Sequence, residues 1–302
     1  MVRNKIAIGT AQFGMVYGIT NSRGKIPASE VGDILERASA ALTELIIDTS
    51  PRYGDSEQII GRLLQERGLR ATLVTKTPRS ADQIISTFVA SLDRLRVDKV
   101  YGVIDHNAQT LLSEDGDKAF KALDRLRKDR CVTKIGASVY NASQIETLLD
   151  RYSVDLIQVP LNILDQRLID SGHLRRVKDR GLELHARSVF LQGVLLNPPP
   201  EVDSRLQRLG SPVRALHDAA RARSLSPLQA ALGFVLGRPE VDRAVIGVTS
   251  LAEFEEVLAA AAPLTIPFPR RFGLTDPDLL DPRSWPEAGS TEISTTASHI
   301  SG

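Results

Sequence analysis

The sequence predicts an α/β protein that forms a single domain, a closed (β/α)8 or TIM barrel. Short apolar runs rich in Val, Ile and Leu alternate eight times with amphipathic stretches over about 260 of the 302 residues. Near-continuous apolar strands separated by helices are typical of a parallel sheet covered by helices. Eight such units match a closed barrel better than an open, doubly wound sheet. The GxGxxG turn that often opens a doubly wound sheet is also missing after the first strand.

Each expected strand is a short, mainly apolar run that ends in a polar turn. In chain order these runs are 5–10, 44–49, 71–76, 99–106, 131–138, 154–159, 182–188 and 242–248.

The helical regions expected between and after them are 28–41, 55–67, 80–95, 115–129, 142–151, 168–180, 212–236 and 251–261. Ser29, Asp55 and Ser250 are expected to cap three of these helices. Pro227 is expected to divide region 212–236, because proline is accepted in the first turn of a helix but not in its interior.

Two regions interrupt the alternation. A long loop, 189–211, is expected after strand seven and contains three consecutive prolines. A C-terminal extension follows Pro263, and we expect Phe272 and Trp285 to pack it over the barrel. The barrel and its extension thus take residues 1–287. Residues 288–302 contain seven Ser or Thr and no aromatic residue, which predicts a disordered tail.

The composition excludes several classes of protein. Lys and Arg total 38 against 37 Asp and Glu, a balance that argues against binding to nucleic acid or to a membrane surface. No apolar run approaches the ~18 residues of a membrane span, and the first residues are too briefly apolar for us to expect a signal peptide. The single cysteine, Cys131, excludes an internal disulfide framework and argues against a Cys-based zinc site. We expect a soluble, cytoplasmic protein that acts on a small molecule.

Polar residues gather where strands two, three and four end. In a (β/α)8 barrel, these strand ends and the loops after them line the mouth where reactions take place. Strand two ends at Asp48, with Tyr53 five residues later, strand three ends at Lys76, and strand four ends at His106. Taken singly, Asp48 could form a turn, and Tyr53 and His106 could be structural. Together on adjacent strand ends, the four predict an active site.

These four side chains suit proton donation to a carbonyl oxygen. A free tyrosine has a pKa near ~10, and the Lys76 ammonium is expected to lower it while Asp48 keeps Lys76 charged. Neutral His106 could donate a hydrogen bond to the same carbonyl. None of these residues supplies a hydride, so a cofactor is required.

Several segments resemble the aldo/keto reductase family, including its bacterial members, over residues 5–262. They are IDTSPRYGDSE, LVTKTP, VIDHN, IGTAQFG, KIGASVYN, IQVPLNILD, ARSVFLQGVLL and VIGVTSLAEFEEVL. The resemblance implies reduction of an aldehyde, ketone or sugar carbonyl with a nicotinamide cofactor, usually NADPH. It makes Tyr53 the acid/base, Lys76 and Asp48 its tuning pair, and His106 the residue that orients the carbonyl.

The resemblance also implies cofactor contacts. Ser138 and Gln158 would hold the nicotinamide carboxamide. The loop over the pyrophosphate would contribute Ser188, Leu191 and Gly193, and the turn at the adenosine phosphate would contribute Gly247, Thr249 and Ser250. Thr10, Asp48, Arg187 and Glu256 complete the expected set.

Four positions depart from the family pattern. Arg187 stands where many members have an aromatic residue, and Val257 replaces an asparagine that often contacts adenine. Glu253 stands where an arginine often binds the 2′-phosphate of NADP, which leaves NADH or dual use open. The N-terminal hairpin that plugs many of these barrels is missing, and a long side chain such as Arg3 is expected to cover that end.

Two alternatives remain at this stage. The protein could be a nicotinamide-binding regulatory subunit with little turnover, or a barrel lyase that uses Lys76 to form a Schiff base. For a reductase, the side chains of Phe13, Tyr17, Phe190 and Trp285 are expected to give the substrate pocket apolar walls.

Overall fold

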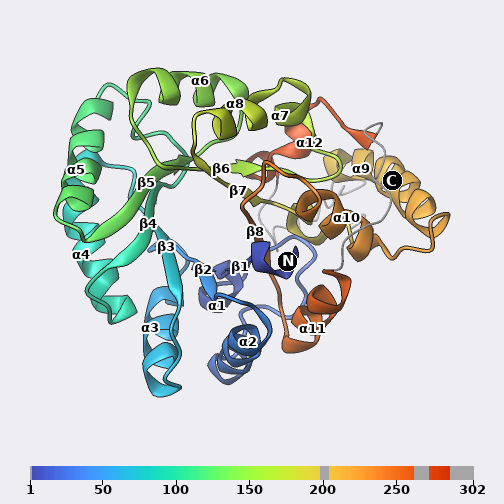
Figure 1. The fold of residues 1–302 in the computed structure, drawn as a ribbon. Coiled ribbons are helices and arrows are strands. Elements are labelled where there is room, and N and C mark those ends of the chain that lie inside the picture. The colour runs from blue at the N-terminus through green and yellow to red at the C-terminus, as the bar shows by residue number, and fades with distance from the viewer. Residues whose placement is uncertain (1, 198–203, 262–271, 286–302) are drawn as a thin grey trace, which may run out of the picture.

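The structure, a computed structural model, describes residues 2–197, 204–261 and 272–285. Eight parallel strands follow one another around a closed barrel, and β1 pairs with β8 to complete it. Helices surround the barrel (Figure 1). The strands are β1 (Ile6–Gly9), β2 (Ile46–Asp48), β3 (Thr72–Lys76), β4 (Val100–Asp105), β5 (Val132–Ser138), β6 (Leu156–Pro160), β7 (Glu183–Arg187) and β8 (Arg243–Gly247). The predicted fold class is confirmed.

The helices lie close to the predicted regions, with short additional turns. They are α1 (Ala11–Gly14), α2 (Ala28–Ala41), α3 (Ser56–Glu66), α4 (Ile84–Leu95), α5 (Gly116–Lys128), α6 (Ala142–Arg151), α7 (Arg167–Asp170), α8 (His173–Asp179), α9 (Ser204–Arg221), α10 (Pro227–Leu236), α11 (Leu251–Ala260) and α12 (Pro277–Leu280). Short 3-10 turns are η1 (Val2–Lys5), η2 (Ala81–Gln83), η3 (Leu191–Gly193) and η5 (Pro282–Ser284). No helix within the described ranges is both long and apolar enough to cross a membrane.

The predicted helix caps have mixed outcomes. Ser250 caps α11 as expected, because its side chain accepts the Glu253 N–H. The prediction for Ser29 is wrong, since α2 begins after Pro27. Asp55 occupies the cap position of α3 without capping it, and its carboxylate pairs with Lys25 instead.

The division at Pro227 is confirmed, and the boundary of the preceding helix is corrected. Pro227 is the first residue of α10, where Ser226 forms a capping box with Gln229. Residues 204–211, expected in the loop after strand seven, belong instead to α9, which begins at Ser204 and carries Pro212 in its interior. A proline is uncommon inside a helix, so no local pattern predicts a helix that runs across it.

The N-terminal end of the barrel is closed by polar side chains. Glu183 on β7 accepts hydrogen bonds from Tyr101 on β4, Lys134 on β5 and His185, at 2.5, 2.5 and 2.7 Å. Contacts between β4 and β7 bridge two intervening strands, which places these groups inside the barrel. Arg3, which was expected to cover this end, is exposed, and the groups that meet inside the barrel are those around Glu183.

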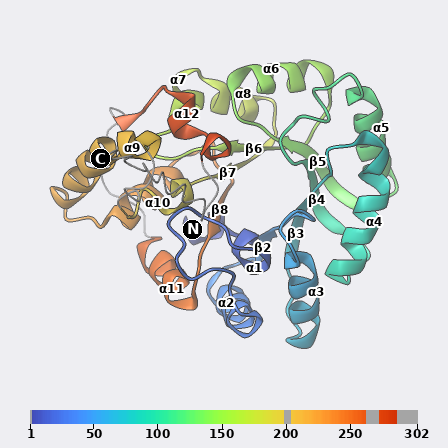
Figure 2. The same cartoon turned by 180° about the vertical axis from the view of Figure 1, so that it is seen from behind.

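The C-terminal extension packs on the molecule as expected. The Leu274 N–H donates to the Leu164 carbonyl at 2.7 Å, and Trp285 is buried, with its Nε1 donating to the Asp278 carbonyl at 3.1 Å. The view from behind shows α12 beside α9 (Figure 2). The predicted tail, 288–302, lies outside the described residues.

Candidate active site

The four residues predicted to carry the chemistry meet at one end of the barrel. Asp48 and Lys76 are the last residues of β2 and β3. Tyr53 lies in the loop after β2, and His106 directly follows β4. All four line one cavity of about 710 Å³.

Two glycines fix the loop that carries Tyr53. Gly54 has a left-handed φ of +54°, and a Cβ on it would fall 2.2 Å from the Gly14 carbonyl oxygen. A Cβ on Gly14 would in turn fall 1.7 Å from the Tyr53 carbonyl oxygen. Because atoms cannot approach so closely, the loop reaches α1 only when both positions lack a side chain.

Lys76 and Asp48 form a buried ion pair next to Tyr53. Lys76 Nζ donates to Asp48 Oδ1 at 2.5 Å and to the Thr49 carbonyl at 2.9 Å. Gln158 Nε2 donates to Asp48 Oδ2 at 2.8 Å. Each carboxylate oxygen thus has a donor, which a buried charge requires. Lys76 Nζ lies 5.1 Å from the centroid of the Tyr53 ring.

The pKa of Tyr53 is raised, contrary to expectation. Burial raises it most and the Asp48 carboxylate raises it further, while Arg187 and Arg52 oppose the shift. Burial and the Asp48 carboxylate outweigh the lowering expected from Lys76, whose charge Asp48 pairs with at 2.5 Å. Tyr53 therefore keeps its proton at neutral pH, which suits a proton donor.

His106 is neutral, as the sequence predicts. Burial first, and then nearby cations led by Lys76, lower the pKa of His106 to about 2. Its ring meets Tyr53 edge to face, with centroids 5.7 Å apart. Its Nδ1 lies 3.1 Å from Ser50 Oγ, which also accepts the Arg52 N–H at 3.1 Å. Ser50 Oγ accepts the Arg52 N–H, and we assign its own hydroxyl proton to His106 Nδ1, the tautomer in which Nε2 carries the ring proton.

Arg187 occupies part of the surface expected to hold nicotinamide. Its Nε donates to Ser138 Oγ at 3.0 Å and its Nη2 to the Val139 carbonyl at 3.2 Å. Its guanidinium carbon lies 4.1 Å from the centroid of the Tyr140 ring. Arg187, at the end of β7, thus lies against an aromatic residue from the loop after β5, as guanidinium planes readily do.

The loop after β7 has an unusual backbone. Left-handed φ values occur at Ser188, Leu191, Gln192 and Gly193. The Gln192 side chain accepts the Ile19 N–H and its backbone carbonyl accepts the Thr20 hydroxyl, both at 3.1 Å. Such backbone conformations at residues other than glycine often mark functional loops. Ser188 and Gly193 line the cavity, whereas Leu191 is buried in the core and does not.

The turn after β8 already holds a carboxylate. Glu253 accepts the Thr249 N–H at 2.6 Å and the Thr249 hydroxyl at 2.7 Å. Gly247, Thr249 and Glu253 line the cavity. Ser250 caps α11, and Glu256 is exposed outside the cavity lining.

The remaining residues expected at the cofactor or substrate site divide between the cavity and the core. Thr10 is fully buried, and its hydroxyl donates to the Asp48 carbonyl at 3.0 Å. Tyr17 and Phe190 line the cavity as expected for substrate walls. The same expectation is wrong for Phe13 and Trp285, which are buried in the core away from the cavity lining.

Sequence reasoning missed Ser50, Gln192 and the pair Tyr140–Arg283. Ser50 lies within the segment that carries Asp48 and Tyr53, so its position was a usable signal. Arg283, from the extension, lies 3.3 Å from the Tyr140 ring centroid, and no local pattern indicates that contact.

Comparisons with known proteins agree with this architecture. L-galactose dehydrogenase of Arabidopsis thaliana is 25% identical over 284 residues, 86% of this chain and 84% of the relative. Aldo-keto reductase YhdN of Bacillus subtilis is 26% identical over 288 residues, 83% of each chain. An aldo-keto reductase from Bacillus halodurans, in its holo form, superposes with a TM-score of 0.72 at 20% identity, covering 86% of this chain and 88% of that chain.

A sequence model of the aldo/keto reductase family matches residues 5–268. Members of this family are oxidoreductases, and NAD(P)H-dependent reduction of carbonyl compounds is typical of them. The match covers the whole barrel, including every strand end that lines the cavity. The chain therefore belongs to the aldo/keto reductase family.

Proposed function

We propose that the protein reduces an aldehyde, ketone or sugar carbonyl with a nicotinamide cofactor, and that Tyr53 donates the proton. The observation that carries this proposal is the position of Tyr53. Its ring lies between neutral His106 and the buried Lys76–Asp48 pair, in one cavity.

Each of these residues has a separate part. When bound, the reduced nicotinamide supplies the hydride. Tyr53 holds a proton at neutral pH and gives it to the carbonyl oxygen, while the charge of Lys76 stabilises the phenolate that is left. His106 Nε2–H donates a hydrogen bond to the same oxygen and so orients the carbonyl. Asp48, held by Gln158, fixes Lys76.

The cavity lining fits a nicotinamide cofactor. Ser138 accepts from Arg187 and Gln158 donates to Asp48, so the Ser138 hydroxyl proton and Gln158 Oε1 remain for a carboxamide, which needs an acceptor and a donor. At the other end, a Cβ on Gly247 would lie 2.9 Å from Gln12 Oε1, so the glycine lets the Gln12 side chain lie close to this strand end in the cavity lining.

A 2′-phosphate fits less well. The Glu253 carboxylate takes the Thr249 N–H and hydroxyl that an anionic group would otherwise use at the start of α11. It would also repel a phosphate dianion. We therefore propose that NADH binds at least as tightly as NADPH, although NADPH is the more usual cofactor of the family.

Calorimetric titration with NADH and, separately, NADPH tests both proposals. We expect micromolar binding of NADH and no tighter binding of NADPH. Glu253→Arg should shift the ratio of the two dissociation constants toward NADPH by about tenfold, because a charge-assisted phosphate contact replaces repulsion. Glu255→Arg makes the same change of charge on the same helix outside the cavity lining and should leave the ratio unchanged. A folded protein that binds neither cofactor would contradict the reductase proposal.

The geometry argues against a Schiff-base lyase. Lys76 Nζ donates to both Asp48 and the Thr49 carbonyl, which favours the ammonium over the neutral amine that attacks a carbonyl. For the regulatory-subunit alternative, the described residues offer no feature in its favour, and steady turnover of a simple aldehyde would dismiss it.

A further inference from the structure

The cavity is rich in positive charge. Six cationic side chains line it, against two carboxylates. Both carboxylates are engaged: Asp48 accepts from Lys76 and Gln158, and Glu253 accepts from Thr249. Three of the six cations, Arg23, Lys76 and Arg283, pair with a carboxylate. Within the described residues, Arg52, Arg79 and Arg187 have no carboxylate partner.

Arg52 and Arg79 stand out among these cations. Arg52 lies in the loop after β2, next to Tyr53, and Arg79 lies in the loop after β3, three residues beyond Lys76. Both line the cavity and are exposed to it or to solvent. Among the residues that the structure describes, neither guanidinium has a carboxylate or a hydrogen-bond partner.

Their charges act where the carbonyl would sit. Both guanidiniums contribute to lowering the pKa of His106, after burial and Lys76, so both lie within electrostatic reach of its ring. A group that Tyr53 and His106 hold by its carbonyl would thus extend toward two uncompensated cations.

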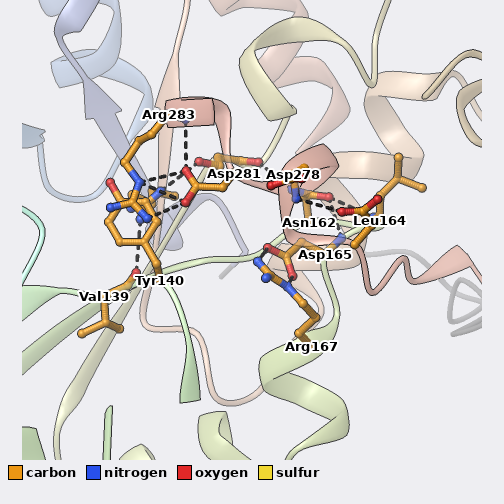
Figure 3. Close-up of polar contacts among 12 residues, drawn as sticks. Val139, Tyr140, Asn162, Leu164, Asp165, Arg167, Asp278, Asp281 and Arg283 are labelled. Atoms are coloured by element: carbon orange, nitrogen blue, oxygen red, sulfur yellow. Dashed lines mark hydrogen bonds and ion pairs between the residues drawn. The ribbon is translucent and has the colours of Figure 1, made fainter. Parts of the chain in front are cut away.

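The arginine that the C-terminal extension contributes to the cavity has a carboxylate partner, unlike Arg52 and Arg79. Arg283, from the extension, pairs with the Asp281 carboxylate at 2.5 Å and lies against the Tyr140 ring, as Figure 3 shows. Asp165 likewise pairs with Arg167 in the same view. Arg283 and Arg167 therefore each have a carboxylate partner, whereas Arg52 and Arg79 in the loops after β2 and β3 do not.

We propose that Arg52 and Arg79 bind an anionic group, a carboxylate or a phosphate, on the carbonyl substrate. This inference rests on the proposed reductase function and names its substrate class. Guanidinium groups bind both oxyanions through paired N–H donors. The anion would lie on the β2–β3 side of the mouth, away from the turn after β8 where Glu253 stands.

Two pairs of matched compounds test the proposal. Succinic semialdehyde is compared with its methyl ester, and glycolaldehyde phosphate with glycolaldehyde, so that each pair differs in the anion. Calorimetry measures binding to protein saturated with the oxidised cofactor, or to the protein alone if no cofactor binds, and a separate assay measures turnover with the reduced cofactor.

We expect the anionic member of at least one pair to bind about tenfold or more tightly than its neutral partner, with the difference shrinking at high salt. The double variant Arg52→Gln/Arg79→Gln should bring that ratio toward one, mainly through the dissociation constant and KM. Arg70→Gln, an exposed arginine between α3 and β3 at the opposite end of the barrel, should leave it unchanged.

Preference for the carboxylate pair or for the phosphate pair would identify the anion. Equal binding within both pairs, or a ratio that the double variant does not alter, would overturn the inference even if both aldehydes are turned over. Absence of turnover with a retained preference for the anions would contradict the reductase function and leave the anion site in place.

Discussion

At the N-terminal end of the barrel, the Glu183 carboxylate accepts from Tyr101, Lys134 and His185. At the C-terminal end, the Asp48 carboxylate accepts from Lys76 and Gln158. Each end thus builds a network of donors around one acid inside the same barrel.

The two ends differ in what they leave open. At the N-terminal end, the Tyr101 hydroxyl is itself bonded to the acid. At the C-terminal end, the Tyr53 hydroxyl and His106 Nε2 have no hydrogen-bond partner in the described parts of the chain, and both residues line the cavity. The structural network thus uses its donors internally, whereas the site for chemistry keeps donors for a ligand.

Removing one lysine from each end gives the largest contrast. We expect Lys76→Met to lower turnover of a simple aldehyde by about 10²–10⁴-fold, because the Tyr53 phenolate loses its stabilising charge. Lys134→Met should leave turnover near that of the parent and lower the free energy of unfolding by about 1.5–3 kcal/mol, the loss of a charged hydrogen bond. Cofactor oxidation rates and urea unfolding measure the two effects.

Asp48→Asn/Lys76→Met provides a second variant for the active-site end, since it leaves no buried charge alone. It should fold and show the same loss of turnover. If Lys134→Met reduced turnover as strongly as Lys76→Met, the distinction between the two ends would be wrong.

A smaller effect is that the two ends stabilise the fold over different ranges of pH. The pKa of His106 is lowered to about 2, against about 6.5 in an unfolded chain. Between these values the unfolded chain binds a proton that the folded protein does not. The free energy of unfolding should therefore fall as the pH drops below about 6.5, by up to about 1.4 kcal/mol per pH unit.

The network around Glu183 at the N-terminal end loses its stabilising effect at a lower pH than His106 does. Burial would raise the pKa of Glu183, but the hydrogen bonds from His185, Lys134 and Tyr101 lower it well below its usual range. The stabilisation that Glu183 contributes is thus present above about pH 4.3 and is lost only below that pH.

The effect of His106 can be measured by urea unfolding at about pH 7 and about pH 5.5. The free energy of unfolding of the parent should be lower at about pH 5.5, and His106→Asn should reduce this difference. An equal decrease in both proteins would contradict the neutral state of His106.

Much of the fold could be predicted because it depends on local patterns. The eight apolar runs mark the strands, and Pro227 marks the start of α10. The start of α9 could not be predicted in this way, because the helix carries Pro212 in its interior, where a proline removes a helix hydrogen bond. The closure by Glu183 joins residues on three strands and has no local signature.

The candidate site divides in the same way. Asp48, Lys76 and His106 could be placed because parallel strands of a barrel end at one mouth. The raised pKa of Tyr53 could not be predicted, because it depends on how closely Asp48 compensates Lys76. The contact of Arg283 with Tyr140 joins the extension to the loop after β5, across a distance in sequence that no motif spans.

The most direct test of the account is the kcat of Tyr53→Phe with a simple aldehyde, measured beside its affinity for NADH. Phenylalanine keeps the ring and its packing against His106 but removes the proton that Tyr53 donates. We predict a loss of about 10²–10⁴-fold in kcat with cofactor affinity nearly unchanged. A Tyr53→Phe protein that turns over like the parent would contradict it.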